Sequence, residues 1–553
     1  MDNDSLIKDD INELDKIGAR AALGIDLNDN WTVTAGILYQ DMETEGVWEH
    51  DTANFPEGGK IQRFNPESSD DEFTQFSLTL EGEFGNNSLV YAGSFLDRET
   101  NYVTDYSAYG DYITWVDFYA CHWGSTTYIA NPTPPGEPEC NSLHEFATRD
   151  NEYERTTHEL RLISIGDSNL HYTVGVFFQQ NEHKYLQQWI QPFMAPSIAV
   201  PGLVRPDVYF RTDQVRDLDQ TAVFGELTFD FTDTLSGTIG ARWFDEEASL
   251  RGVVGWGPYA FDTTFYPGNP SFLDVTPDSK TSASDTIFKA NLTWNMSDDV
   301  MLYFTWSEGY RPGGINREPS LPPSEAAWEQ DLLTNYEIGW KTTLAGGRVR
   351  LNGAAYFMEW EDIQFTIYDS SLSFCCGNVY NLSTAELKGL EADITVLASD
   401  ALSFSASVSF NSAETTADFR LPIGTEILAV PNGSPLPNVP DFKGNIVARY
   451  HFNIGDTGAY AQIAYSYTGS SRSSIRPATV DRRFPGDNTN YPQDSFSIAN
   501  LRAGIDKESW GVDLFVNNLT DESADYFVHP RNYEPTVVTN RPRSYGAKVW
   551  MRF

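Results

Sequence analysis

Apolar and polar residues alternate along most of this chain in long runs. In the run 30–41, Trp31, Val33 and Ile37 fall on one face, and Thr32 falls on the other. Because successive side chains on a strand point to opposite sides, each run predicts a β-strand with one apolar face. Many runs reach roughly 10–13 residues, beyond the usual length of soluble strands and near the length that crosses a bilayer. The pattern therefore predicts membrane-spanning strands.

Short turns and long loops follow each other in strict alternation. The segments 25–31, 231–235 and 294–300 are rich in Asp, Asn, Ser or Thr, whose side chains favour tight turns by hydrogen-bonding nearby backbone. The other connections are much longer and hold much of the proline and glycine. A barrel in the bacterial outer membrane has this asymmetry, with short periplasmic turns and long extracellular loops. The expected loops are 42–72, 99–153, 183–218, 249–283, 308–332, 370–383, 414–440, 470–493 and 519–540.

The runs predict an all-β fold, a transmembrane antiparallel β-barrel with about 19 strands. Bacterial single-chain barrels have an even number of strands, and plugged transporters have about 22. We therefore expect residues 1–16 to be an acidic loop remnant and residues 17–553 to be a truncated barrel that lacks its first strands. The predicted strands are 17–27, 30–41, 73–84, 87–98, 154–164, 169–182, 219–232, 235–248, 284–295, 299–307, 333–344, 347–366, 385–397, 401–413, 441–453, 457–469, 494–506, 509–518 and 541–553.

Composition agrees with a membrane barrel. The formal net charge of −42 argues against a nucleic-acid-binding surface, which needs basic patches. The mean hydropathy is −0.40, and a transmembrane barrel tolerates this value because only every second residue faces lipid. Aromatic residues make up 14% of the chain, as expected for girdles at both membrane interfaces. Residues 1–10 have neither the basic nor the apolar region of a secretory signal.

The end of the chain resembles the C-terminal assembly signal of bacterial outer-membrane β-barrels. Tyr545, Ala547, Val549, Met551 and Phe553 share one face of the last predicted strand, and Phe553 is the final residue. This resemblance implies insertion by the barrel-assembly machinery. It places the protein in the outer membrane of a Gram-negative bacterium, in contact with outer-membrane lipid and lipopolysaccharide.

A wider set of short motifs resembles the barrel of TonB-dependent outer-membrane receptors. Each motif is short, and their order and spacing over residues 17–553 carry the resemblance. Their glycines and prolines also fit strand ends and close approaches between strands. The motifs lie at 222–229, 240–244, 303–316, 336–341, 350–357, 360–364, 381, 388–391, 516–522 and 553.

The resemblance implies uptake of a scarce solute, driven by the inner-membrane TonB complex. A ferric siderophore or another iron complex is the expected cargo, and haem, cobalamin or an oligosaccharide are alternatives. The family's signal peptide, TonB-contacting box and plug are not found in this sequence, so TonB would act through the missing plug. Two further hypotheses are a passive pore or surface-binding barrel, and a non-functional receptor fragment.

Four cysteines fall in predicted extracellular loops, where disulfides are permitted. A Cys121–Cys140 disulfide would close a loop of about 20 residues and contribute roughly 3 kcal/mol in the chain-entropy account. Cys121 and Cys140 could instead join His122 and His144 in a metal site, although this spacing matches no standard zinc motif. Cys375 and Cys376 are adjacent, and their pairing stays open. No metal site and no cofactor are assigned.

Two other loop features have alternative interpretations. Acidic residues at 70–72, with Asp41 and Glu43, could bind Ca²⁺ or bridge divalent ions to lipopolysaccharide phosphates, or could simply be solvated. Loop residues that could contact a catecholate or a sugar, or merely pack in the loops or girdles, are Trp48, Tyr106, Trp115, Trp123, Tyr266, Tyr310 and Arg311. The eight histidines are scattered and no hydrolase or phosphate-binding motif occurs, so no enzyme is predicted.

Overall fold

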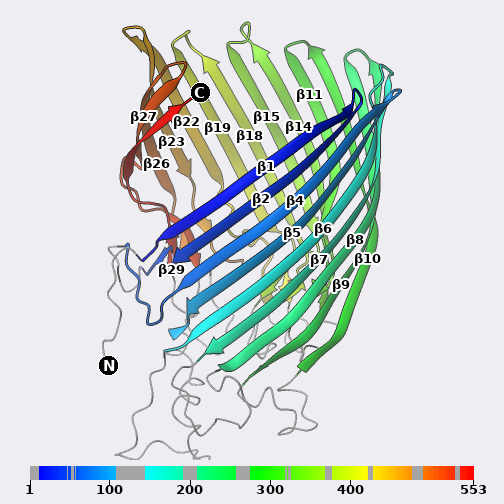
Figure 1. Ribbon diagram of the computed structural model, residues 1–553, viewed down its shortest axis with the longest axis vertical. Helices are drawn as coiled ribbons and strands as arrows, with labels where there is room; N and C mark the ends of the chain where they lie inside the picture. The colour runs from blue at the N-terminus through cyan, green and yellow to red at the C-terminus, as the bar shows by residue number, and fades with distance from the viewer. Residues whose placement is uncertain are drawn as a thin grey trace, which may run out of the picture.

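The computed structural model is one antiparallel sheet of 19 strands that curls into the wall of a barrel (Figure 1). It describes residues 11–552 except 47, 52–54, 56–57, 108–143, 191–207, 257–273, 318–320, 322–325, 368–376, 421–427, 476–489 and 530–535. Each long strand pairs with its neighbours in chain order, so the topology is a simple meander. The predicted fold class and the predicted strand number are confirmed. Among the described residues, no helix is long and apolar enough to cross a membrane.

The 19 wall strands differ in length, and those of the first half are the longest. Their bounds are β1 (Leu14–Asn28), β2 (Trp31–Glu45), β4 (Ser68–Phe84), β5 (Asn87–Asp105), β6 (Phe146–Ser164), β7 (Leu170–Ile190), β8 (Val208–Thr232), β9 (Leu235–Trp256), β10 (Asp274–Ser297), β11 (Val300–Arg311), β14 (Asp331–Leu344), β15 (Val349–Glu361), β18 (Thr384–Leu397), β19 (Leu402–Thr415), β22 (Phe442–Ile454), β23 (Thr457–Thr468), β26 (Phe496–Asp506), β27 (Trp510–Asn517) and β30 (Ser544–Met551).

Short strands lie in the long loops at the extracellular rim. They are β3 (Glu49–His50), β12 (Gly314–Ile315), β13 (Ala327–Trp328), β16 (Gln364–Ile367), β17 (Asn378–Asn381), β20 (Phe419–Arg420), β21 (Leu428–Val430), β24 (Ser471–Arg472), β25 (Pro492–Gln493), β28 (Asp525–His529) and β29 (Thr536–Thr539).

Several predicted loops are wrong in part, because the strands continue beyond the lipid. Residues 208–218, 249–256 and 274–283 were expected in loops, yet they extend β8, β9 and β10. Beyond the membrane both faces of a strand meet water, so the apolar alternation that marks a strand in the sequence disappears while the backbone ladder continues. The predicted strand 347–366 is also divided, since Asp362 takes a φ of 52° between β15 and β16.

Register fixes which residues face the lipid. On β7, Val174, Val176 and Phe178 point outward, and Val176 pairs with Val223 of β8 on the same face. Val176 keeps 50% of its surface exposed, and Ile239 of β9 keeps 63%. Large apolar side chains at such exposure are expected only where lipid replaces water. The membrane-spanning part of β7 therefore ends near Phe178.

Glycines inside the membrane-spanning strands receive aromatic rings from the adjacent strand. A Cβ added to Gly389 would lie 2.2 Å from the ring of Tyr356, and Gly339 has the same relation to Tyr303. The Tyr356 hydroxyl then reaches Asn411 Oδ1 at 2.5 Å. The close approach between strands that the glycines of the motifs at 336–341 and 388–391 predicted is therefore present at Gly339 and Gly389, because a ring lies where a side chain would stand.

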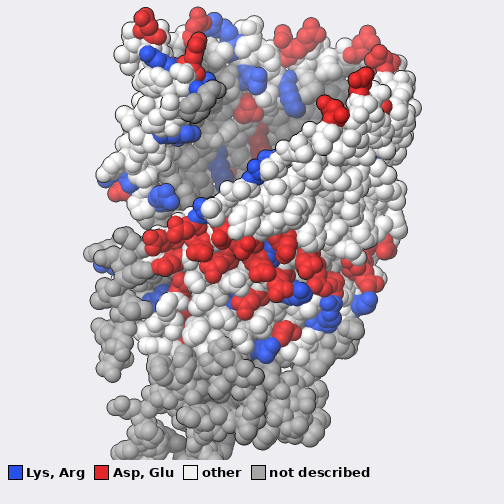
Figure 2. All heavy atoms as spheres, in the orientation of Figure 1, with Lys and Arg blue, Asp and Glu red and all other residues white. Residues whose placement is uncertain are grey.

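A belt of acidic residues crosses the outer face of β4–β9 immediately beyond the apolar band (Figure 2). We define it by its outward-facing acidic residues, which register brings into transverse rows. Glu72 pairs with Glu99, and Glu99 pairs with Glu152. Basic residues neutralise part of the negative charge of the belt, since Lys184 Nζ lies 2.9 Å from Glu152 Oε2. The belt comprises Asp70, Glu72, Asp97, Glu99, Glu152, Glu154, Glu182, Asp217, Asp219, Asp245 and Glu247.

The acids predicted to lie in a loop at 70–72 are thus part of β4. Asp71 points to the inner face and accepts two hydrogen bonds from Arg98, at 2.8 and 2.6 Å. Asp70 and Glu72 belong to the acidic belt on the outer face, because successive side chains on a strand point to opposite surfaces.

A small sheet ties the first extracellular loop to the last. β3 pairs with β29, and β29 pairs with β28. The Thr536 hydroxyl donates to Glu49 Oε2 at 2.7 Å. We call this sheet the clasp. Among the described residues, β1 pairs only with β2 and β30 only with β27, so the clasp is the link that joins the two sides of this seam (Figure 1).

Candidate functional site

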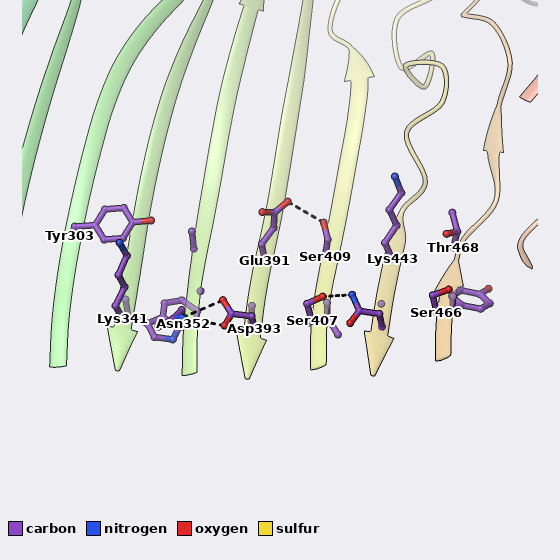
Figure 3. Close-up of a pocket in the computed structure, with 18 residues that line it drawn as sticks. Tyr303, Lys341, Asn352, Glu391, Asp393, Ser407, Ser409, Lys443, Ser466 and Thr468 are labelled. Atoms are coloured by element: carbon purple, nitrogen blue, oxygen red, sulfur yellow. Dashed lines mark hydrogen bonds between the residues drawn. The ribbon is translucent and has the colours of Figure 1, made fainter. Parts of the chain in front are cut away.

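A polar hollow of about 600 Å³ lies on the inner wall between β11 and β23 (Figure 3). Most of its lining comes from two rows of inward-facing residues, which extend beyond the hollow to Met301 and Gly339 and form because neighbouring strands pair in register. Small side chains such as Ala354 and Ser409 make the wall recede here. One row is Tyr303, Gly339, Ala354, Glu391, Ser409, Lys443 and Thr468. The other is Met301, Lys341, Asn352, Asp393, Ser407, Asn445 and Ser466.

Side chains in the hollow bond along the rows and leave charged groups facing the lumen. Asn352 Nδ2 donates to Asp393 Oδ2 at 3.1 Å, and Asn445 Nδ2 donates to Ser407 Oγ at 2.6 Å. Lys341 and Lys443 form no ion pair with any residue that the structure describes, although both line the hollow. The wall therefore offers polar and cationic groups to whatever occupies the lumen.

A second inward-facing group lies on β6–β8, extracellular to the apolar band. Tyr153 pairs with His183, and His183 pairs with Arg216, so one transverse row carries all three. The Tyr153 and His183 rings stack with centroids 4.2 Å apart. His183 also meets the edge of Tyr185 at 5.9 Å. We call Tyr153, His183, Tyr185, Arg216 and Arg317 the arginine–aromatic cluster.

Arg317 reaches this cluster from the segment after β12. Its Nη1 donates to Gln187 Oε1 at 3.2 Å, and the Tyr185 hydroxyl donates to the same oxygen at 2.5 Å. The preceding Asn316 is buried and exchanges hydrogen bonds with the backbone of Val379, at 2.8 and 3.0 Å. The hydrogen bonds of Asn316 to Val379 and of Arg317 to Gln187 thus fix this segment, and Arg317 lies near Arg216.

The two arginines carry charge that the described part of the wall does not neutralise. Burial and the nearby Arg317 lower the pKa of Arg216, and its Nε has no hydrogen-bond partner among the described residues. Burial and the charge of Arg216 lower the pKa of His183 to about 4, so that ring is neutral at pH 7. Arg98 in the same row differs, because Asp71 binds it through two hydrogen bonds.

The predicted residues Tyr310 and Arg311 are held by contacts within the protein. Tyr310 stacks on Phe244 with centroids 3.8 Å apart, and its hydroxyl donates to Glu246 Oε1 at 2.9 Å. Arg311 Nε donates to Asp331 Oδ2 at 2.8 Å, and its guanidinium lies over the ring of Trp360. Both side chains therefore secure the extracellular end of β11 against its neighbours.

The other predicted residues are dispersed. Trp48 is 42% exposed, and Tyr106 lies between Arg149 and Trp189. No group of three or more metal-ligating side chains occurs in the described ranges. Tyr545, Ala547, Val549 and Met551 are on β30, with Tyr545, Val549 and Met551 largely exposed. Predicted residues outside the described ranges are Trp115, Cys121, His122, Trp123, Cys140, Tyr266, Cys375, Cys376 and Phe553.

Sequence reasoning missed the arginine–aromatic cluster. His183 and Arg216 were assigned to the ends of one long predicted loop, although both are strand residues that register places side by side. The alternation of His183, Tyr185 and Gln187 is a period-two signal that could have extended the strand. Nothing in the sequence indicates that Arg317 contacts this wall.

Comparison with known proteins identifies relatives. The family model "TonB dependent receptor-like, beta-barrel" matches residues 47–519. The pesticin receptor of Yersinia enterocolitica is 20% identical over 307 residues, which cover 55% of this chain and 41% of the receptor. The Yersinia pestis pesticin receptor matches with the same identity and coverage. The chain thus spans less than half the length of these curated relatives.

Solved structures share the fold. The ferric yersiniabactin uptake receptor FyuA of Yersinia pestis superposes with a TM-score of 0.71 and 14% identity, covering 98% of this chain and 71% of FyuA. The ferric-catecholate import receptor Fiu of E. coli has a TM-score of 0.70 and 14% identity, with 98% and 75% covered. The ferric citrate transporter FecA has a TM-score of 0.67 and 12% identity, with 98% and 71% covered.

Proposed function

Because this chain belongs to the TonB-dependent receptor family through its β-barrel domain, we propose that it forms the barrel of an outer-membrane receptor for an iron complex. Members of the family are transport receptors, not enzymes, and lie in the outer membrane of Gram-negative bacteria. The expected cargo is a ferric siderophore or another scarce iron complex. The TonB complex supplies the energy through a plug inside the barrel.

The polar inner wall is the observation that carries this proposal. Lys341, Asn352 and Asp393 lie in one of the two hydrophilic rows, at the height of the lipid-facing band. A polar solute that crosses a bilayer loses its hydration unless the path supplies hydrogen-bonding groups. The rows supply them on the lumen side, while the other face of the same strands stays apolar. Lys341 and Lys443 would contact a plug or the solute.

Three further partners belong to the proposal. Strands and a plug encoded outside this sequence would complete the barrel between β1 and β30 and fill its lumen. The acidic belt would face lipopolysaccharide at the outer leaflet, with divalent cations between its carboxylates and the phosphates. The outward apolar face of β30, with Tyr545, Val549 and Met551, would be read by the barrel-assembly machinery.

The test uses the receptor gene that encodes this chain, in its host and in a host without TonB. We expect growth on a supplied iron complex under iron limitation, and loss of that growth when either the receptor or TonB is deleted. Uptake of radioactive iron measures the same property directly. Growth and uptake that persist without TonB, together with steady conductance in planar bilayers, would instead support a passive pore.

A further inference from the structure

We propose that a cavity between the inner wall and the small β12–β13 sheet binds a calcium ion, with Glu246 and Gln330 as protein ligands. The cavity has a volume of about 260 Å³ and lies at the extracellular side of the apolar band. Glu246 and Thr281 line it from β9 and β10, and Gly313, Trp328 and Gln330 line it from the opposite side. We call it the loop cavity. It is separate from the polar hollow, and the proposal does not depend on the cargo.

Glu246 carries the first argument, because one oxygen of its carboxylate has no partner. The Tyr310 hydroxyl donates to Oε1 at 2.9 Å, and Gln220 Nε2 donates to the same oxygen. Both donors are neutral groups. Oε2 is buried and accepts no hydrogen bond from any residue that the structure describes, and Glu246 as a whole is 3% exposed. Burying a charged oxygen without a donor or a cation is costly, so this oxygen requires a ligand.

Gln330 supplies a second unpartnered oxygen. Its Nε2 donates to Asp285 Oδ2 at 2.9 Å, while its Oε1 is buried and accepts no hydrogen bond within the described ranges. Turning the amide over would place Oε1 against the Asp285 carboxylate, where two acceptors would repel each other. The orientation of the amide is therefore set by Asp285. The loop cavity is thus lined by two residues that each keep a buried oxygen for a ligand.

Charge favours a cation over water at these oxygens. The whole chain has a net charge of −42, and Glu246 lies between Asp245 and Glu247 of the acidic belt. Arg242 meets the network at Gln220 Oε1, to which its Nη2 donates at 3.0 Å, and not at Glu246 Oε2. A water molecule can donate to both unpartnered oxygens, but it leaves the buried negative charge uncompensated. A cation satisfies the oxygens and the charge together.

Calcium fits both the donor set and the room. Ca²⁺ takes roughly six to eight oxygen ligands, including carboxylate, amide and water oxygens, in flexible geometry. The Thr281 hydroxyl belongs to the lining, and a cavity of about 260 Å³ holds several waters at roughly 30 Å³ each. Mg²⁺ demands a nearly ideal octahedron, which one carboxylate and one amide from different segments do not impose. The bound ion would tie β9 to the segment between β13 and β14. With a single carboxylate, the expected dissociation constant is on the order of 10⁻⁴–10⁻³ M.

The experiment uses the full receptor, purified in detergent without lipopolysaccharide and freed of divalent cations by a chelator. Thermal unfolding is followed as CaCl₂ is added. Tb³⁺, which replaces Ca²⁺ at oxygen sites, is detected by luminescence that Trp328 in the cavity wall sensitises. We expect the melting temperature to rise with Ca²⁺. A tenfold excess over the dissociation constant should raise the ratio of folded to unfolded protein about 11-fold. Mg²⁺ should bind more weakly.

Matched variants assign the ion to the loop cavity. Glu246→Gln keeps the shape and the Oε1 acceptor, and it should abolish both the Ca²⁺ shift and the Tb³⁺ emission. Gln330→Glu adds a second carboxylate and should bind Ca²⁺ more tightly than the wild type, a gain that a merely structural role would not give. Glu247→Gln, on the outer face, should leave the emission unchanged. Trp328→Phe should lose the emission and keep the Ca²⁺ shift. Heat-modified mobility in gels reports whether each variant is a folded barrel.

The outcomes separate this site from the proposed function. A Ca²⁺ shift of equal size in the wild type and in folded Glu246→Gln would overturn the site. The absence of any response to Ca²⁺, or tighter binding of Mg²⁺ than of Ca²⁺, would overturn it as well. In each of these cases uptake of an iron complex would still stand, because growth and iron uptake with and without TonB test it independently.

Discussion

His183 lies nearly parallel to Tyr153 on the inner wall, with ring centroids 4.2 Å apart and planes inclined by 12°. The two residues are direct partners in the β6–β7 ladder. His183 Nε2 also lies 2.9 Å from Asn151 Oδ1. One register position thus holds the imidazole among an aromatic ring, an amide and the guanidinium of Arg216, and its neutral form is favoured by burial and by the charge of Arg216.

This arrangement predicts acid sensitivity. Burial and Arg216 lower the pKa of His183 from 6.5 to about 4, so the unfolded chain binds the proton more readily. The stabilisation from neutral His183 is present above pH 6.5 and is lost as the pH falls toward 4. Thermal unfolding in detergent should show a smaller loss of melting temperature over this range in His183→Phe than in the wild type. His171→Phe, at an exposed position, should behave like the wild type; an equal loss in His183→Phe would contradict the assignment.

A second prediction concerns the Arg98–Asp71 pair. Asp71 is buried on the inner face and holds Arg98 through two hydrogen bonds. Asp71→Asn should lower stability by about 1 kcal/mol, since Arg98 is partly exposed and water screens much of the interaction. A double-mutant cycle with Arg98→Met should yield a coupling energy of similar size. Additive effects of the two substitutions would show that the pair contributes no stability.

The glycine–aromatic contacts predict that adding a methyl group at the glycine lowers the stability of the barrel. In Gly389→Ala the new methyl would stand where the ring of Tyr356 now lies, 2.2 Å away. We expect the ring to leave Asn411 and the stability to fall by about 1–3 kcal/mol. Tyr356→Leu in the same background should recover part of the loss. Gly346→Ala, in a tight turn with open space around it and a φ of 63°, would test backbone strain instead.

The acidic belt predicts dependence on divalent cations. Glu99 and Glu152 are direct partners on the outer face, and like charges at such positions repel. Burial raises the pKa of Asp219, and the negative charges of the neighbouring Asp217 and Glu247 raise it further, so repulsion also acts within the belt. Chelation of Ca²⁺ and Mg²⁺ should lower the melting temperature in lipopolysaccharide-containing micelles. Glu99→Gln/Glu152→Gln should reduce that effect, whereas Glu81→Gln, on the inner face of β4, should not.

The membrane-embedded part of this fold could be predicted because every second residue of a membrane-spanning strand faces lipid and is apolar, which gives the sequence a period of two. Runs such as 170–178 alternate strongly, and the strand number follows from counting them. The extracellular extensions of β8–β10 could not be found in this way, since both of their faces meet water or the lumen. The arginine–aromatic cluster was hidden for another reason. Its row depends on the register between strands, and the contact of Arg317 depends on tertiary structure.

The clasp joins residues that are almost as far apart in the chain as the sequence allows. Glu49 and Thr536 are separated by 487 positions, yet they share a hydrogen bond. Every wall strand from β4 to β27 must be in place before these two loops can meet, because contacts of such long range form only after the intervening chain is ordered. A pair of spectroscopic probes at Glu49 and Thr536 would therefore report completion of barrel assembly. Proteolytic sensitivity of these loops would identify barrels whose assembly is incomplete.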